Sequence, residues 1–245
     1  MEYVTPRFLD CGEAGLSVEF GDSVDPAINA RVLALDDMLR AAPPPGLYET
    51  TPTYRALFLR YEPLEISRAA LIQRVETLIA DMGPASSGAP ARRRWTLPCC
   101  YDPAVAEDIG EAAARLGLAE GELAALHAGA EYRAYMYGFA PGWCYLGGLP
   151  QALAIPRRAS PRPPTPPGAM LIGGALALIA ANPMPTGWYV VGRTPERMFA
   201  PERRPPVLVA PGDAIRFAPV DAAAFAALDA RAASGETLAR REDLQ

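Results

Sequence analysis

The alternation of apolar and polar residues near the start of the chain predicts a strand followed by a helix. In residues 15–20 every second side chain is apolar, as expected for a strand with one buried face. Asp25 and Pro26 are a typical N-cap and first helical residue, and apolar residues recur behind them at helical spacing as far as Leu39. The predicted helix ends before the proline-rich residues 43–46.

The residues that follow predict two more strands and a second helix. Residues 47–49 and 54–61 flank a Thr-Thr-Pro-Thr turn, and Ser67 opens a helix whose apolar stripe reaches Met82. The predicted order is then βαββα. One more strand would complete the βαββαβ ferredoxin-like unit, in which two helices cover one face of a sheet. We therefore expect a small ferredoxin-like α/β domain.

A stretch of small residues and prolines at positions 83–90 is typical of a linker. We place a domain boundary there, which gives a ferredoxin-like domain at residues 1–90 and a second domain at residues 91–245. After the linker, alternation around Leu97 predicts a strand, and the Asp-Pro pair at residues 102–103 predicts the start of a helix.

From Tyr132 onward the chain changes to short β-type runs separated by glycine and proline turns. This pattern is typical of an all-β barrel or sandwich, so the expected fold class is α+β. A short helix is expected before it, over residues 121–127, and the charged tail 231–245 is interpreted as a frayed terminal helix. The β-type runs are residues 132–139, 170–172, 188–191, 207–210 and 214–217.

Composition narrows the classes of protein that the chain can represent. Half of its residues are hydrophobic (50%), yet it has no stretch of about 18 uncharged apolar residues that could span a membrane. The first ten residues lack the basic and apolar blocks of a signal peptide, so we expect a cytoplasmic protein with no membrane association. The formal net charge of −5 argues against general nucleic-acid binding, which usually needs a basic surface.

All 23 positively charged side chains are arginine, and the chain contains no lysine. This absence excludes a phosphate-binding P-loop, a Schiff-base enzyme, an amidase with a lysine base and a biotin carrier. The four cysteines have no CxxC spacing and are interpreted as reduced thiols. A single histidine excludes a multi-histidine metal site, and we expect no metal bound by these side chains.

Three blocks rich in glycine or arginine follow one another between residues 135 and 195. They read Tyr-Met-Tyr-Gly-Phe-Ala-Pro-Gly-Trp-Cys-Tyr-Leu-Gly-Gly-Leu, then Ile-Pro-Arg-Arg-Ala-Ser-Pro-Arg, then Thr-Gly-Trp-Tyr-Val-Val-Gly-Arg-Thr-Pro. In this order they resemble the signature of the allophanate hydrolase subunit 1 family, GFxPGFxYLGGL, PRxxxPR and GGWxxIGRTP. That family includes the B subunit of 5-oxoprolinase and a sporulation-kinase inhibitor.

The resemblance implies a cyclophilin-like β-barrel as the second domain and a homologous second subunit as partner. It also implies ATP-dependent opening of 5-oxoproline, a small cyclic amide, to glutamate. ATP with Mg²⁺ would be bound by this chain or jointly with the partner, and a third, lactam-binding subunit would take part. Two alternatives stay open: a non-enzymatic module that inhibits a histidine kinase, and a carboxyl-transfer component of urea or allophanate metabolism.

The first block supplies most of the candidates for substrate binding. Glycines permit tight turns and let backbone N–H groups approach an anion, although barrel-corner turns would use the same residues. Aromatic residues could stack on a flat ligand, although in β-rich sequence they are more often part of a core. The candidates carried over from the family signature are Gly138, Phe139, Gly142, Tyr145, Gly147, Gly148, Arg162, Gly187, Trp188 and Thr194.

The arginines and the single histidine are the candidates for chemistry. Arg157, Arg162 and Arg193 lie in turn-rich segments, where a guanidinium can bind a carboxylate or phosphate through two hydrogen bonds, and surface ion pairs are the alternative role. We expect the three to converge in one electropositive pocket on the barrel, with Arg157 and Arg193 catalytic. His127 is the natural general acid or base, and a packed, hydrogen-bonded side chain is the alternative. Cys144 is interpreted as an inert buried thiol rather than a nucleophile.

The chain departs from the family pattern on the ligand side of the signature. Pro-Pro-Gly-Ala-Met stands where members commonly have PAGSV, Ile-Ala-Ala where they have IYP, and Pro-Thr-Gly-Trp where they have PGGW. These changes leave the substrate open between 5-oxoproline and an amide derived from urea or allophanate.

Overall fold

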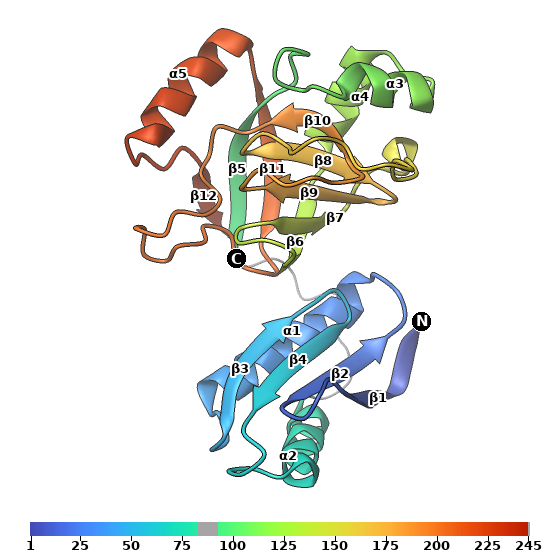
Figure 1. Ribbon diagram of the computed structural model, residues 1–245, viewed down its shortest axis with the longest axis vertical. Coiled ribbons are helices and arrows are strands. Elements are labelled where there is room, and N and C mark those ends of the chain that lie inside the picture. The colour runs from blue at the N-terminus through green and yellow to red at the C-terminus, as the bar shows by residue number, and fades with distance from the viewer. Residues whose placement is uncertain (83–92, 245) are drawn as a thin grey trace. The chain divides into compact units, whose positions relative to one another are not determined.

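The computed structural model of the chain describes residues 1–82 and 93–244. The chain divides into two compact units, Met1–Pro90 and Ala91–Gln245, and each unit has its own sheet (Figure 1). Each unit also has its own buried core. The predicted linker lies outside the described residues. Within the described ranges, no helix combines the length and apolar character needed to cross a membrane.

The first unit is a four-stranded antiparallel sheet with the order β1-β2-β4-β3. Two helices pack their apolar stripes against one face of it, where Leu16, Val18 and Leu57 are completely buried. The elements are β1 (Glu2–Asp10), β2 (Gly15–Gly21), α1 (Pro26–Ala41), β3 (Leu47–Pro52), β4 (Ala56–Tyr61) and α2 (Arg68–Asp81).

The two helices of this unit begin where the sequence predicts. A carboxylate oxygen of Asp25 accepts hydrogen bonds from the N–H groups of Ala27 at 2.7 Å and Ile28 at 3.2 Å. The hydroxyl of Ser67 accepts from the N–H of Ala70 at 3.2 Å. These side chains satisfy N–H groups that have no partner within the helix, which fixes its first turn.

The ferredoxin-like order βαββαβ is not confirmed. The fourth strand of the sheet is β1, which precedes β2 and pairs with it, so the order is ββαββα. The strand was missed because it lies at the edge of the sheet, has no buried residue and contains Pro6. Its residues therefore show no alternation of buried and exposed positions.

The second unit confirms the predicted β-barrel. Seven strands follow one another in the order β10-β8-β9-β7-β6-β11-β5, and the ring closes where Arg193 of β10 pairs with Cys100 of β5. β5 and β11 are parallel and the other neighbours are antiparallel. The elements are β5 (Arg93–Cys100), α3 (Ile109–Leu116), α4 (Glu120–Gly129), β6 (Tyr132–Tyr137), β7 (Cys144–Gly147), the 3-10 helix η1 (Gln151–Leu153), β8 (Ala169–Gly173), β9 (Leu176–Ala180), β10 (Tyr189–Arg193), β11 (Ala214–Val220), α5 (Ala222–Ala233) and β12 (Arg240–Asp243).

Three local predictions for this unit are wrong. The helix predicted from Asp102 begins at Ile109 instead, because the Asp102 carboxylate accepts from the N–H of Ala104 at 2.9 Å and closes a separate turn. Residues 207–210 form no strand and contribute a single bridge. The tail is not helical to its end: α5 stops at Ala233, and β12 pairs with β5 outside the ring.

Successive residues of the barrel strands pack into two different cores. Met170 of β8 packs into the barrel interior with Leu97 and Ile215, whereas the next residue, Leu171, packs into a separate cluster with Trp188. Because successive side chains of a strand point to opposite faces, this second cluster lies on the outside of the barrel. Trp143, Tyr145 and Trp188 of the family signature pack in this outer cluster.

Candidate functional site

The signature arginines lie on an extended segment, residues 154–167, which we call the arginine arm. Backbone hydrogen bonds hold the arm along the loop that precedes β10. The N–H of Arg158 donates to the carbonyl of Gly187, and the N–H of Arg162 to that of Thr186, both at 2.8 Å. The proline-rich arm is therefore an ordered segment and not a flexible linker.

One side of the arm is held by an ion-pair network with α3 and the turn before it. The carboxylate of Asp108 lies 2.9 Å from Arg158 and 3.1 Å from Arg162, and it also accepts a 2.8 Å hydrogen bond from the N–H of Val190. The network joins three arginines to three carboxylates, namely Arg115, Arg158 and Arg162 with Glu107, Asp108 and Glu111. These ion pairs anchor the arm. Because the formal charges of the network balance, it offers no surplus positive charge to a ligand.

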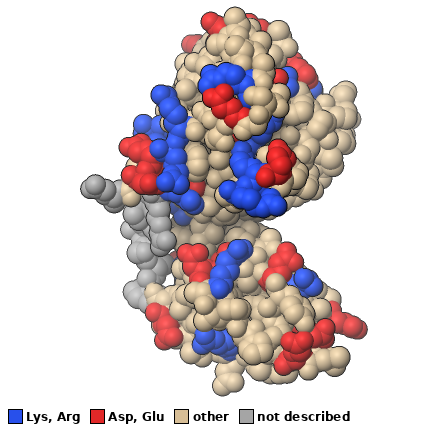
Figure 2. Space-filling view, turned by 90° about the vertical axis from the view of Figure 1, so that its left-hand side faces the viewer, with Lys and Arg blue, Asp and Glu red and all other residues tan. Residues whose placement is uncertain are grey.

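Glu111 shows how tightly this network is coupled. It accepts from Arg158 at 2.6 Å and from Arg115 at 3.0 Å. Burial raises the pKa of Glu111, but the hydrogen bonds from the two guanidinium groups outweigh it and the pKa is lowered overall. Figure 2 shows the same mixture more widely, since arginine and acidic side chains lie side by side on the visible face of the second unit.

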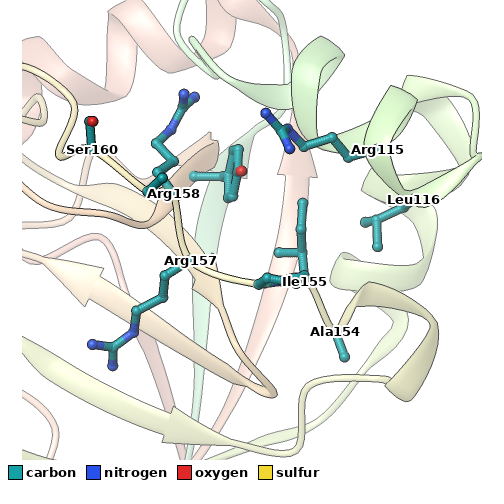
Figure 3. Close-up of a pocket in the computed structure, with 10 residues that line it drawn as sticks. Arg115, Leu116, Ala154, Ile155, Arg157, Arg158 and Ser160 are labelled. Carbon is teal, nitrogen blue, oxygen red and sulfur yellow. The ribbon is translucent and has the colours of Figure 1, made fainter.

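A pocket of about 570 Å³ lies beside this network, between the arm and the end of α3 (Figure 3). Its volume falls in the range of small-molecule sites, roughly 300–1,000 Å³. Two guanidinium groups lie over the ring of Tyr189, with the guanidinium carbon of Arg158 at 4.4 Å from the ring centroid and that of Arg115 at 5.8 Å. The remaining lining residues are Leu116, Ala154, Ile155, Pro156, Arg157, Ala159 and Ser160.

Arg157 points to the other side of the arm. In Figure 3 its guanidinium is directed away from those of Arg115 and Arg158, although its residue also lines the pocket. Neighbouring side chains of an extended segment point in opposite directions, which explains why Arg157 and Arg158 separate. Arg157 is exposed and makes no ion pair with any described residue, so its positive charge is not balanced.

The face of Trp188 supports the Arg157 side chain. The guanidinium carbon lies 5.0 Å from the centre of the indole, and Trp188 is only 4% exposed. A side chain at Gly173 would come within 2.8 Å of the indole ring, so this glycine lets Trp188 lie directly on β8. The ring of Tyr145 meets Trp188 edge-on at 6.1 Å. Burial raises the pKa of Tyr145, and the positive charge of Arg157 opposes that shift.

Arg193 and Thr194 lie away from Arg157. The Nε of Arg193 donates to the carbonyl of Pro167 at 2.8 Å, and its guanidinium lies over the ring of Phe225 in α5. Thr194 is completely buried and its N–H donates to the carbonyl of Gly168.

The expected convergence of Arg157, Arg162 and Arg193 in one pocket is therefore not found. Arg162 pairs with carboxylates near α3, and only Arg157 of the three lines the pocket. Arg193 is separated from Trp188 by the length of β10, which is about 16 Å for five steps of roughly 3.3 Å. The sequence placed Arg193 and Trp188 in one signature block. The whole of β10 follows Trp188, so Arg193 lies at the far end of β10 from Trp188 and Arg157.

The signature glycines are explained by packing and turns. The N–H of Gly138 donates to the carbonyl of Trp143, so this amide is used inside the turn that joins β6 and β7. A side chain at Gly147 would come within 2.0 Å of the Tyr135 ring, and one at Gly142 within 2.4 Å of Phe199. Gly148 has a left-handed φ of 95° and packs on the carbonyl of Glu131. An anion-binding role for these amides stays a prediction.

Phe139 is the unusual residue of this turn. It has a φ of 69°, a conformation that a non-glycine residue rarely adopts, and its side chain is 66% exposed. Its ring lies 5.1 Å from that of Trp143, which is buried. The geometry assigns Phe139 a place at the surface beside the outer core, and its role in substrate binding stays a prediction.

His127 lies inside a cluster of aromatic residues. It is completely buried, its Nδ1 lies 2.9 Å from the hydroxyl of Tyr101, and its ring stacks on Phe217 at 5.1 Å. Burial lowers the pKa of His127 to about 3, so the imidazole is neutral at physiological pH. These contacts favour the packed role, and a catalytic role stays a prediction.

Cys144 is also buried inside the barrel. Burial raises the pKa of its thiol to about 12, so thiolate is scarce at neutral pH. This environment agrees with the interpretation of Cys144 as an inert thiol. Among the described residues, no group of three or more histidine, cysteine, aspartate or glutamate side chains is arranged to hold a metal ion.

The sequence did not single out Asp108, Arg115 or Tyr189. Glu111 and Arg115 have the i,i+4 spacing of a helical ion pair, which could have indicated one edge of the network. Asp108 carried no such signal, because its partners lie about fifty positions further along the chain. In the sequence, Tyr189 is simply one residue of the predicted strand at residues 188–191.

Comparisons with known proteins agree with this architecture. Residues 6–209 match the family described as "Carboxyltransferase domain, subdomain C and D". The chain is 31% identical over 216 residues to the B subunit of 5-oxoprolinase from Bacillus subtilis (strain 168), which covers 84% of this chain and 89% of that protein. It is 40% identical over 128 residues to the B subunit of 5-oxoprolinase from Escherichia coli O157:H7, which covers 52% of this chain and 59% of that protein.

Solved structures share the fold. The crystal structure of TTHA0988 has a TM-score of 0.74 and 35% identity, and the match covers 84% of this chain and 40% of that chain. Urea carboxylase of Kluyveromyces lactis has a TM-score of 0.78 at 16% identity, over 98% of this chain and 24% of that chain. The chain thus spans 40% and 24% of the length of these two structures.

The closed barrel, the separate four-stranded sheet and the ordered arginine arm define a domain of the carboxyltransferase type. The chain belongs to the carboxyltransferase subdomain C and D family, with the 5-oxoprolinase B subunits among its relatives, which confirms the resemblance seen in the sequence.

Proposed function

We propose that this chain is a subunit of a 5-oxoprolinase-type enzyme that opens the lactam ring of 5-oxoproline to give glutamate. In this proposal it acts with ATP, a homologous second subunit and a third, lactam-binding subunit in the cytoplasm. The observation that carries the proposal is the similarity to the B subunit of 5-oxoprolinase from Bacillus subtilis over nearly the whole of both proteins.

The arginine arm supports binding of an anionic substrate. Its anchor residues Arg158 and Arg162 are neutralised by carboxylates, whereas Arg157 keeps its charge at the surface beside two aromatic rings. A substrate with a carboxylate next to a small ring fits this combination of charge and apolar surface.

The pocket beside α3 does not fit ATP with Mg²⁺. A triphosphate needs surplus positive charge, but the network that holds Arg115 and Arg158 pairs each cation with a carboxylate. The chain also has no lysine to contact the phosphates. We therefore place ATP jointly with the partner subunit in this proposal and assign none of its chemistry to this chain.

Reconstitution tests the proposal. The chain is purified together with its partner subunits, and glutamate release from 5-oxoproline is measured with and without ATP. We expect ATP-dependent release that needs this chain, so mixtures that lack it or lack ATP serve as controls. If the complete mixture releases no glutamate, the proposal is wrong.

A second candidate function is carboxyl transfer in urea or allophanate metabolism. The description of the matching family, a carboxyltransferase domain, favours it. The test is transfer of a carboxyl group from carboxylated biotin to urea by the complex. Transfer without any glutamate release from 5-oxoproline would replace the first proposal by this one.

A further inference from the structure

A charge count along the arginine arm separates its three arginines into two groups. Arg158 and Arg162 have carboxylate partners at 3.1 Å or less, and their side chains are 19% and 8% exposed. Arg157 is exposed and has no carboxylate partner in the described part of the chain. Arg157 is therefore the cation of the arm that is available to an anionic ligand.

The backbone on both sides of Arg157 is fixed. The N–H of Arg158 donates to the carbonyl of Gly187 at 2.8 Å, and Ile155 exchanges hydrogen bonds of 3.0 and 2.6 Å with Gly174. The ion pairs of Arg158 hold the next side chain in place. Arg157 thus projects from an ordered segment, so less conformational entropy is lost when it binds a ligand.

The contact with Trp188 leaves the binding edge of Arg157 free. A guanidinium carries its N–H groups around its rim, in the plane of the group, and binds a carboxylate through two of them. The guanidinium carbon of Arg157 lies over the face of the Trp188 indole, 5.0 Å from the ring centroid, and this face offers no carbonyl or carboxylate oxygen to the N–H groups. The contact orients the guanidinium without using its N–H groups. Tyr145, whose ring lies 6.1 Å from that of Trp188, adds apolar surface beside it.

We propose that Arg157, held on Trp188 and flanked by Tyr145, is the receptor for the carboxylate of the substrate. The guanidinium edge binds the carboxylate, and the ring of Tyr145 packs against the apolar ring of a small cyclic amide acid. This inference rests on the proposed function for the identity of the substrate. It places recognition on the outer face of the barrel, on the side of the arm opposite the charge-balanced network around Asp108.

The test uses Arg157→Gln in the reconstituted complex, because an exposed side chain can be changed without disturbing the core. We expect the KM for 5-oxoproline to rise about tenfold to a hundredfold, which corresponds to loss of a charge-assisted hydrogen bond, with a much smaller change in kcat. The matched control is Arg204→Gln, which removes another exposed arginine of the same unit whose contacts are local carbonyls. Inhibition by 2-pyrrolidinone, the same lactam without a carboxylate, should be equal in the wild type and both variants.

The outcomes separate this inference from the proposed function. An active complex in which Arg157→Gln behaves like Arg204→Gln overturns the receptor and leaves the function intact. If the wild-type complex releases no glutamate, the full chain alone is titrated with 5-oxoproline and with inorganic phosphate by calorimetry. If the wild-type chain binds 5-oxoproline and the Arg157→Gln variant does not, the proposed role of Arg157 as the carboxylate receptor is supported even without activity. Equal binding by both proteins, no binding, or binding of phosphate only overturns it.

Discussion

At the scale of single residues, the complete burial of His127 has a consequence for stability. Burial lowers its pKa from 6.5 to about 3, so the unfolded chain binds more protons than the folded chain between these pH values. The contribution of neutral His127 is therefore fully present above pH 6.5 and is lost as the pH falls toward about 3. We expect the free energy of unfolding to fall by up to about 1.4 kcal/mol per pH unit from this residue.

Urea unfolding at pH 7.0, 6.0 and 5.0 measures this slope, in a range where carboxylates contribute little. The comparison protein is His127→Gln, which keeps a hydrogen-bonding partner for the Tyr101 hydroxyl but does not titrate. Its overall stability should be lower, because a ring stacked on Phe217 is lost, but its slope in this range should be much shallower. An identical slope in both proteins would contradict the assignment to His127.

The close approach at Gly147 gives a second prediction at this scale. A side chain there would lie 2.0 Å from an atom of the Tyr135 ring, and Tyr135 is only 3% exposed and cannot move away. Gly147→Ala should therefore destabilise the protein by about 1–3 kcal/mol, the range for overpacking a core. Gly121→Ala in the first turn of α4 is the control, because nothing lies within 4 Å and alanine favours a helix over glycine by up to roughly 1 kcal/mol. Thermal unfolding should move in opposite directions for the two variants.

At the scale of elements, the arginine arm depends on Asp108. Its carboxylate pairs with Arg158 and Arg162 and accepts the N–H of Val190, so it joins the arm to β10. Asp108→Asn removes the charge while keeping a side-chain oxygen for Val190. We expect a loss of about 2 kcal/mol or more, because two mostly buried guanidinium groups lose a counter-charge. Urea unfolding measures the loss, and hydrogen exchange at the amides of Arg158 and Arg162 should become faster.

An exposed ion pair provides the comparison for Asp108. Glu131 contacts Arg94 and Arg216, and 40% of its side chain is exposed. Glu131→Gln should cost less than about 1 kcal/mol, as exposed pairs usually do, and should leave hydrogen exchange in the arm unchanged. If both variants have the same small effect, Asp108 does not anchor the arm.

The elements also show what the sequence could and could not predict. The alternation over residues 15–20 and the caps at Asp25 and Ser67 are local signals, and the structure has the predicted strand and helices there. β1 gave no such signal, since an edge strand without a buried face has no alternating pattern. The turn at Asp102 looked like a helix start because both structures use an aspartate in the same way.

For the candidate site as well, the sequence could predict some features and not others. Sequence placed Arg157 and Trp188 in the same signature, and the structure brings them into contact. It could not separate Arg157 from Arg162, because the carboxylates that neutralise Arg162 lie more than fifty positions earlier in the chain. Which arginine keeps a free charge is decided by long-range ion pairs and by the alternation of side chains along the arm.

At the scale of the whole molecule, the two units have separate cores. The core of the first unit draws its apolar residues from positions 8–82, and the clusters of the second from positions 95–239. No buried cluster of the described residues mixes the two sets. A unit of 155 residues is large enough to bury a stable core, whereas one of 90 residues is closer to the lower limit.

We therefore expect residues 91–245, expressed alone, to fold and to unfold in one cooperative transition, which circular dichroism during heating would show. A fragment that aggregates or melts without a transition would contradict separate folding. The arm, Trp188 and Tyr145 all belong to this unit, so the folded fragment should bind 5-oxoproline with the affinity of the full chain in a calorimetric titration. If the fragment folds but no longer binds, while the full chain does, the first unit contributes to the site and Arg157 on its aromatic support is not sufficient.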